Sequence, residues 1–266
     1  MSTLDVDELL RCFHRRMAYC AATRWLVVLS IAAAFAMPGP PDGSGASAFA
    51  AIWLVAVLLG WLLLVIVSVR TARTAHLAGA LLSLGRLDEA EEALADVLRS
   101  FSIFRSTLLR ASQQLGTLLH ARQEHGQAVK VFQAILRSVR SGLRRQRSLE
   151  AAIRLMWADC ELAVGNLAGA YEAFRPVYTM QLGLSERLLL LPVELRYDLA
   201  AGHARHAAGN LAEKIRLAEL LESPQAASVH AMLAEACRGA GMPVQAEFLE
   251  RRACLYRTPE SPAPTT

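Results

Sequence analysis

Two histidines, His203 and His206, stand three residues apart in a stretch predicted to be helical, and this spacing places both imidazoles on one helix face. Two imidazoles in this arrangement are able to ligate a metal ion. However, no cysteine or acidic residue stands at the neighbouring spacings of the usual metal-binding motifs, so we expect no metal site here. An enzyme that uses these histidines is the weakest of the three function classes that the sequence leaves open.

Other catalytic motifs are missing from the sequence. The five cysteines form no C-x-x-C pair, and in a reducing compartment buried free thiols are the default. The chain has no phosphate-binding G-x-x-x-x-G-K-[ST] loop, no H-E-x-x-H and no G-x-S-x-G. We therefore expect a protein that is not an enzyme and that needs no cofactor or metal.

The composition indicates a helical protein with a membrane part. Of the 266 residues, 54% are hydrophobic and 20% are charged, whereas ordinary soluble domains are about 45–50% apolar and about 25% charged. The excess is mainly alanine and leucine, which favour helix. A net charge of +4 over 266 residues is too small to indicate nucleic acid as a partner.

The apolar excess is concentrated in two segments near the N-terminus. Residues 49–69 carry no charge and span about 32 Å as a helix, enough for a hydrocarbon core of about 30 Å. A first span over residues 19–37 requires Arg24 to reach the membrane interface with its charge. Residues 38–48 between them are rich in proline and glycine. The sequence therefore predicts a two-helix transmembrane hairpin over residues 19–69.

Arginines flank both outer ends of this hairpin, and the connecting loop has no basic residue. The positive-inside rule then places both termini and the rest of the chain in the cytoplasm, under a bacterial-type inner membrane. In the alternative reading, residues 1–36 are a cleaved signal peptide, because Ala34-Phe35-Ala36 has the form of a cleavage site. The large C-terminal part is cytoplasmic in both cases.

Residues 1–18 have an amphipathic pattern. Ser2 with Asp5 fits a capping box, and Val6, Leu9 and Phe13 belong to one helical stripe. This segment is either an interfacial helix attracted to anionic membrane lipid or a cytoplasmic extension of the first span.

From residue 70 to 257 a recurrent pattern of turn glycines and small residues predicts stacked helix pairs. The residues that define the register are Gly85, Gln123 in place of a glycine, Gly165, Gly209 and Gly241, with Gly116 and Gly202 in the first helices and packing residues Ala90, Ala128, Ala170 and Ala246. Lys214 stands where the fourth packing alanine is expected. Such glycines permit tight turns, and such alanines let helices approach closely.

This pattern resembles the tetratricopeptide repeat family. The resemblance implies an α-solenoid of about five helix pairs, with a generic helical bundle as the alternative. The register residues are 38, 42, 44 and 32 apart, whereas the family period is 34, so the middle helices are expected to be extended. The proline-rich residues 258–266 are expected to be disordered.

The resemblance also implies a partner-binding concave groove lined by the first helix of each pair. The positions concerned are Arg110, Gln113, Thr117, His120, Asp159, Arg196, His203, His206, Glu235 and Arg238. A second candidate surface is a basic patch, for which anionic lipid headgroups are the most economical ligand. Its residues are Arg137, Arg140, Arg144, Arg145 and Arg147.

Together these features predict a membrane-anchored scaffold or assembly protein that holds a protein partner at the cytoplasmic membrane face. The alternative is a stable, non-catalytic accessory subunit of a larger membrane complex. The two differ in whether Trp53, Gly60, Trp61 and Ser68 lie at a helix–helix contact, as in a subunit, or face lipid.

Overall fold

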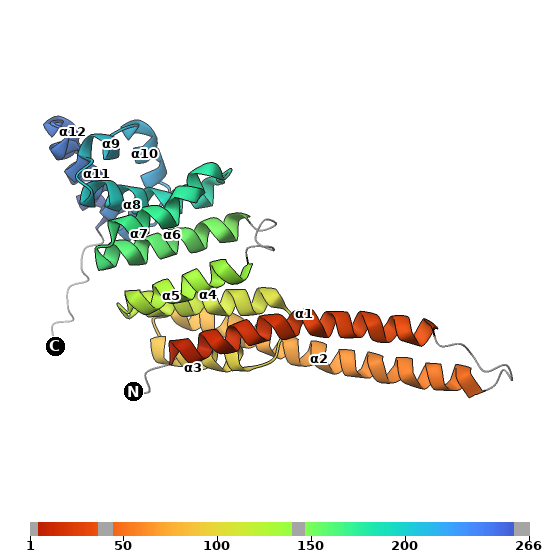
Figure 1. Ribbon diagram of the computed structural model, residues 1–266. Coiled ribbons are helices and arrows are strands. Elements are labelled where there is room, and N and C mark those ends of the chain that lie inside the picture. Colours follow the sequence, from red (N-terminus) through yellow and green to blue (C-terminus); the bar gives the residue numbers. More distant parts are fainter. Residues whose placement is uncertain (1–4, 37–44, 140–146, 258–266) are drawn as a thin grey trace, which may run out of the picture. The chain divides into compact units, whose positions relative to one another are not determined.

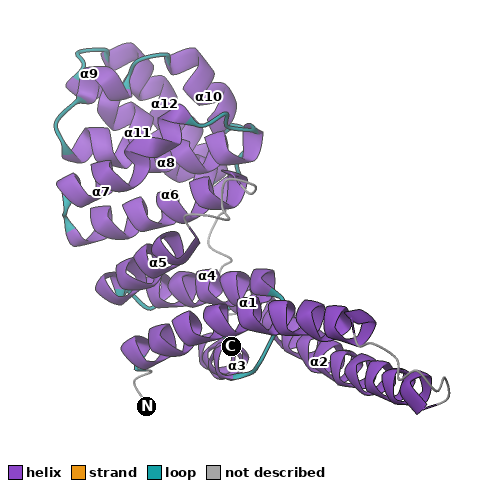
Figure 2. Cartoon of the chain, turned by 45° about the vertical axis from the view of Figure 1, so that its right-hand side comes forward, coloured by secondary structure: helices purple, strands orange, loops and turns teal. Residues whose placement is uncertain are grey.

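Every element that the computed structural model describes is helical, and the described residues are 5–36, 45–139 and 147–257 (Figures 1 and 2). This part of the chain holds twelve α-helices and one short 3-10 helix, so the all-α prediction is confirmed. The chain divides into two compact units, residues 1–138 (unit 1) and 139–266 (unit 2). The tail 258–266 and three residues of the basic patch, Arg140, Arg144 and Arg145, lie outside the described residues.

Unit 1 contains two long helices and three shorter ones. The long helices α1 and α2 run antiparallel and side by side, and they extend together beyond the other three (Figures 1 and 2). Helix α2 packs against α3, and both helices pack against α4. The bounds are α1 (Val6–Ala36), α2 (Gly45–Ser83), α3 (Leu87–Arg99), α4 (Arg105–Ala121) and α5 (His125–Val139).

Unit 2 continues the same kind of packing. Helix α6 contacts α7 and α8, α8 contacts α9 and α11, and α11 packs along α12. Its core includes Phe174, Leu195 and Leu233, each at most 1% exposed. The bounds are α6 (Arg147–Val164), α7 (Leu167–Phe174), the 3-10 helix η2 (Arg175–Thr179), α8 (Leu184–Ala200), α9 (Ala204–Ala207), α10 (Leu211–Ala218), α11 (Ser223–Gly239) and α12 (Pro243–Tyr256).

Five helices, α2, α4, α6, α8 and α11, end in the same way. Each is followed by a residue in the left-handed conformation, and the next backbone N–H donates to the carbonyl five residues earlier, at 2.7 to 3.0 Å. This is the Schellman arrangement, which closes a helix and turns the chain. The left-handed residues, with φ between 66° and 82°, are Gly85, Gln123, Gly165, Gly202 and Gly241.

This regularity corrects the fourth register residue expected from the sequence. The turn residue is Gly202, which the sequence placed inside a first helix, and not Gly209, which has no positive φ. The spacings between the left-handed residues become 38, 42, 37 and 39 residues. An alanine then stands five residues after each of them, and Lys214 is no longer an exception. These alanines, all at most 2% exposed, are Ala90, Ala128, Ala170, Ala207 and Ala246.

Only one of the two predicted membrane spans is supported by the structure. Within the described residues, one segment, Ile52–Ser83 of α2, is long and apolar enough to cross a membrane; its most apolar stretch of 18 residues has a mean hydropathy of 2.9 and is 6% buried. Helix α1 does not qualify, so the two-span transmembrane hairpin was wrong in this respect. The physical reason is length, because the uncharged run of α1 that begins at Trp25 covers only about 20 Å. Helix α2 itself continues past residue 70 without a break.

The first half of α1 is part of the core of unit 1. Its side chains at Val6, Leu9 and Phe13 are at most 5% exposed, and α1 contacts α3 and α4 as well as α2. The predicted apolar stripe of α1 therefore packs against other helices of unit 1 and not against lipid. Cleavage after Ala36, as the signal-peptide reading requires, would remove this helix from the core.

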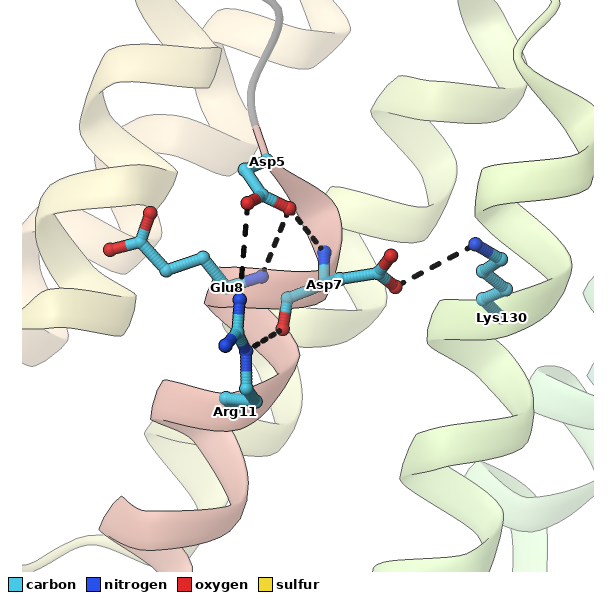
Figure 3. A network of polar contacts seen from close by, with 5 residues as sticks. All are labelled: Asp5, Asp7, Glu8, Arg11 and Lys130. Atoms are coloured by element: carbon cyan, nitrogen blue, oxygen red, sulfur yellow. Dashed lines mark hydrogen bonds and ion pairs between the residues drawn. The ribbon is translucent and has the colours of Figure 1, made fainter.

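Polar contacts fix the beginning of α1 (Figure 3). The carboxylate of Asp5 accepts hydrogen bonds from the backbone N–H groups of Asp7 and Glu8, at 3.0 and 3.1 Å, and so caps the helix. Ser2, the expected cap, lies outside the described residues. Lys130 of α5 reaches Asp7 at 3.6 Å, and this exposed ion pair contributes at most about 1 kcal/mol.

A buried histidine makes the stability of unit 2 depend on pH. His230 of α11 is fully buried, neither ring nitrogen has a hydrogen-bond partner, and the ring stacks on Tyr256 at 5.5 Å. Burial lowers the pKa of His230 below its ordinary 6.5, and the nearby Arg252 lowers it further, against the opposing charge of Glu219. As the pH falls through 6.5, His230 becomes protonated in the unfolded chain but stays neutral in the folded chain. The free energy of unfolding therefore decreases.

We expect His230→Phe to remove this part of the pH dependence and to stabilise unit 2 by about 1–2 kcal/mol at pH 7, because two unsatisfied polar atoms leave the core while the stacking remains. Denaturant unfolding followed by circular dichroism between pH 5 and pH 8 measures both effects. An unchanged slope of stability against pH in the variant would contradict the assignment to His230.

Candidate functional site

A pocket of about 330 Å³ opens on unit 2, where α7, η2, α8 and the start of α9 meet. Four aromatic rings, two carboxylates and two imidazoles line it. The residues are Tyr171, Phe174, Tyr178, Glu194, Tyr197, Asp198, His203 and His206. No serine, threonine or cysteine belongs to this lining, so within the described residues the pocket has no hydroxyl or thiol nucleophile other than tyrosine.

One wall of the pocket is aromatic. Tyr171, Phe174 and Tyr178 follow one another at helical spacing across α7 and η2, and α8 adds Tyr197. The rings of Tyr171 and Tyr197 are stacked, with centroids 6.0 Å apart, and Phe174 meets Tyr197 edge-on at 5.0 Å. Phe174 is 1% exposed, so this wall continues directly into the core and is held rigidly.

The other wall is acidic. Glu194 and Asp198 lie one turn apart on α8, and Asp198 is 3% exposed although it lines the pocket. The turn at Gly202 brings the histidines back over the end of α8, because the backbone N–H of His203 donates to the carbonyl of Asp198 at 2.7 Å. The ring Nδ1 of His206 then lies 2.7 Å from Asp198 Oδ2.

Tyr178 is a neutral phenol that contacts this acidic wall. Burial raises the pKa of Tyr178, and the carboxylate of Glu194, with which it forms a hydrogen bond, raises it further. The hydroxyl group therefore keeps its proton over the physiological range and donates a hydrogen bond to the carboxylate of Glu194. This contact ties η2 to α8 across the pocket.

Three potential metal ligands come together in the pocket. One ligand atom each from Glu194, Asp198 and His206 lies within 4.8 Å of the others. The sequence reasoning missed the two acids because they precede His206 by twelve and eight residues, on another helix. Their spacing of four residues on a helix, followed by a turn glycine, was the available signal.

The ten residues predicted to line a partner-binding groove are divided between the two units. Four of them, Arg110, Gln113, Thr117 and His120, belong to α4 of unit 1. In unit 2, Arg196 forms an ion pair with Asp159, and Arg238 forms one with Glu250 at 2.7 Å. His203 and His206 line the pocket, and Glu235 is exposed on α11. That these positions contact a partner stays a prediction.

The basic patch is described in part only. Arg137 is at the end of α5, where it lies 3.4 Å from Gln133 of the same helix. Arg147 begins α6. No side-chain contact with an acid is found for Arg137, so its charge is available on the surface of the described part of unit 1.

Comparison with known proteins gives no further information about this pocket. The chain matches no protein-family model, no curated protein and no solved structure.

Proposed function

We propose that this chain is a membrane-anchored helical-repeat protein that holds a protein partner at the cytoplasmic face of the membrane. The observation that carries the proposal is the continuity of α2. Between residues 52 and 69, α2 presents exposed apolar side chains such as Leu58 and Leu62, and its last turns form the first of the stacked helix pairs. A binding module that is joined to its anchor by one continuous helix is held at the membrane, which raises its effective concentration for partners there.

The arrangement of charge supports a cytoplasmic position for both units. Arg70 and Arg73 follow the apolar part of α2, as expected at a cytoplasmic membrane boundary. Arg16 of α1 donates a hydrogen bond to the backbone carbonyl of Arg99 at 2.5 Å, which ties the first half of α1 to the helix pairs of unit 1. In this proposal lipid covers the exposed apolar surface of α2.

Similarity to the tetratricopeptide repeat family remains part of the proposal. Five helix pairs that share a left-handed turn residue and a buried alanine support a repeat. The spacing of 37 to 42 residues is longer than the 34 of that family, so the superhelical geometry of the family is not implied.

A scaffold and an accessory subunit differ in what covers the surface of α2, which is lipid in a scaffold and a partner's helix in a subunit. Ser68 is buried and accepts a hydrogen bond from the backbone N–H of Ile103 at 2.9 Å, so it serves unit 1 itself. Trp53 is 41% exposed, and a side chain at Gly60 would meet nothing within 4 Å. These positions are open to lipid in a scaffold and to a partner's helix in an accessory subunit. Extraction in mild detergent followed by size analysis and mass spectrometry distinguishes the two, because a permanent subunit would migrate with a stoichiometric partner.

The cytoplasmic position predicts a labelling pattern for one cysteine. Cys254 of α12 is exposed, whereas Cys20, Cys160 and Cys237 are buried. Burial raises the pKa of Cys160 to about 12, with the carboxylates of Asp159 and Glu161 adding to the effect, so this thiol is unreactive at neutral pH. In a Cys12→Ser background, a membrane-impermeant maleimide should label the chain in inverted vesicles and not in intact cells.

The control is the additional change Cys254→Ser, which should abolish labelling in inverted vesicles. Labelling of Cys254 in intact cells would place unit 2 outside the cytoplasm and would overturn the proposed function.

A further inference from the structure

We infer that the pocket of unit 2 is a receptor for the guanidinium group of an arginine side chain that the protein partner presents. The inference rests on the proposed function and names the chemistry of the partner segment. Three features of the pocket lead to it: an acidic wall that pairs with no lysine or arginine of the described residues, an aromatic wall and the size of the pocket.

The acidic wall lacks a cation. Within the described residues, neither Glu194 nor Asp198 forms an ion pair with a lysine or an arginine, and the nearest arginine on α8, Arg196, is paired with Asp159. Asp198 is 3% exposed, and the ion-pair geometry that it has is with the imidazole of His206. A buried carboxylate is costly without a counter-charge, so a ligand that brings a positive charge into the pocket is favoured.

Glu161 occupies the position of Asp198 in the preceding helix pair, and its carboxylate accepts hydrogen bonds from side chains of the same pair. Glu161 stands four residues before the turn residue Gly165, as Asp198 stands four residues before Gly202. The carboxylate of Glu161 accepts hydrogen bonds from Trp157 Nε1 at 2.8 Å and from Asn166 Nδ2 at 2.9 Å. The chain therefore satisfies this position with two N–H donors in one helix pair, whereas in the next pair the carboxylate contacts the imidazole of His206 and lines a pocket.

The aromatic wall selects a planar cation with an apolar stem. Tyr171 and Tyr197 present stacked faces at an interplanar angle of 28° beside the two carboxylates. A guanidinium group stacks on such faces and also forms two parallel hydrogen bonds with a carboxylate, which an ammonium group does not do. A volume of about 330 Å³ admits the aliphatic stem of the side chain as well.

A divalent metal ion is the competing occupant. One ligand atom each of Glu194, Asp198 and His206 lies within 4.8 Å of the others, so an ion has to be tested as a ligand. However, the Nδ1 of His206 already lies 2.7 Å from Asp198 Oδ2. The pocket is also far larger than a single ion needs.

The five tyrosines of the chain allow the binding to be measured directly. The full chain is produced with 3-fluorotyrosine, solubilised in detergent and observed by fluorine NMR. Tyr171, Tyr178 and Tyr197 line the pocket, whereas Tyr19 and Tyr256 are absent from its lining and act as internal controls. The probe is the blocked peptide acetyl-Gly-Arg-Gly-amide at about 1–10 mM, a range suited to weak binding of a single side chain. The same peptide with the uncharged isostere citrulline, and ZnCl₂ alone, are separate titrations.

The arginine peptide should shift the three pocket resonances and leave the other two in place, and the citrulline peptide should shift none. The isosteric change Asp198→Asn keeps an acceptor for His206 but removes the charge, and it should weaken binding by about tenfold or more, because charge-assisted hydrogen bonds are lost. Glu186→Gln makes the same change of charge on α8 outside the pocket and should leave the affinity unaltered.

Equal shifts with citrulline, unchanged affinity of Asp198→Asn, or binding of zinc without binding of the arginine peptide would each overturn the inference. These outcomes are independent of membrane anchoring, because a chain that fails the labelling test with Cys254 can still bind the peptide, and a correctly anchored chain can fail to bind it.

Discussion

Replacing Gly116 by alanine should destabilise unit 1 by about 2 kcal/mol, because overpacking of a closed core costs about 1–3 kcal/mol. Gly116 lies on α4 against the ring of Phe132 on α5, and Phe132 is fully buried. A Cβ atom at Gly116 would come within 2.5 Å of Cζ and 2.6 Å of Cε1 of this ring. A ring held on all sides cannot withdraw, so the two helices must separate. Thermal unfolding by circular dichroism, with hydrogen exchange of α4 and α5 as the local readout, measures the effect.

Gly126 provides the matched control. It is also a helical glycine of unit 1, on α5, but a Cβ atom there would meet nothing within 4 Å. The change Gly126→Ala should therefore be neutral or stabilise by up to about 1 kcal/mol through helix propensity alone. The second change Phe132→Leu should recover part of the loss in Gly116→Ala. If both alanine variants had the same stability, close approach of α4 and α5 at Gly116 would be refuted.

The helix-pair register could be predicted from sequence where a glycine is needed for a reason of backbone geometry. Gly85, Gly165 and Gly241 each adopt a positive φ, which other residues rarely adopt. Gln123 does so as well, with a φ of 66°, and its position was inferred only from its neighbours in the pattern.

The fourth pair was misread because the same tripeptide has two different roles. Gly-Asn-Leu occurs at 165–167 and again at 209–211. In the first case the glycine ends α6 in the left-handed conformation, whereas in the second the asparagine, Asn210, has a φ of 51° and separates α9 from α10. Local sequence does not distinguish the end of a first helix from a break within the second half of a pair. What distinguishes the two is the alanine five residues after the turn. Ala207 is buried, which assigns the turn to Gly202.

The pocket could not have been predicted from spacing along the chain. Its walls come from α7, η2, α8 and α9, and they meet only because η2 interrupts the second helix at Pro176 and the chain turns at Gly202. His203 and His206 were identified as chemically notable, but the acids that give them a role lie in the preceding helix. Sequence alone indicated the imidazoles and not the aromatic wall.

A helix long and apolar enough to cross a membrane was predicted correctly for α2 and incorrectly for α1, and the difference is one of length. Hydropathy identifies a long uncharged run reliably, whereas a run of about 20 Å beside an arginine is compatible with a helix that is partly held by protein. Buried Phe13 and Cys20 show that α1 has such a role in unit 1.

The largest change in localisation should follow from two charges on the exposed face of α2. Leu58 and Leu62 are 63% and 53% exposed and lie one turn apart in the apolar run. An arginine near the centre of a bilayer costs about 2.5–3.5 kcal/mol, so Leu58→Arg with Leu62→Arg removes about 6 kcal/mol of membrane affinity. We expect this double variant to move from the carbonate-resistant membrane fraction to the soluble or aggregated fraction.

The matched control places the same two charges on exposed apolar side chains outside α2. Leu220 and Val244 of unit 2 are 59% and 75% exposed, so Leu220→Arg with Val244→Arg alters exposed surface and net charge in the same way. This control should remain in the membrane fraction, because in the proposed function its positions face water. Retention of both variants in the membrane would show that the exposed surface of α2 does not anchor the chain. Release of both would instead mean that added charge, and not its position on α2, determines the localisation.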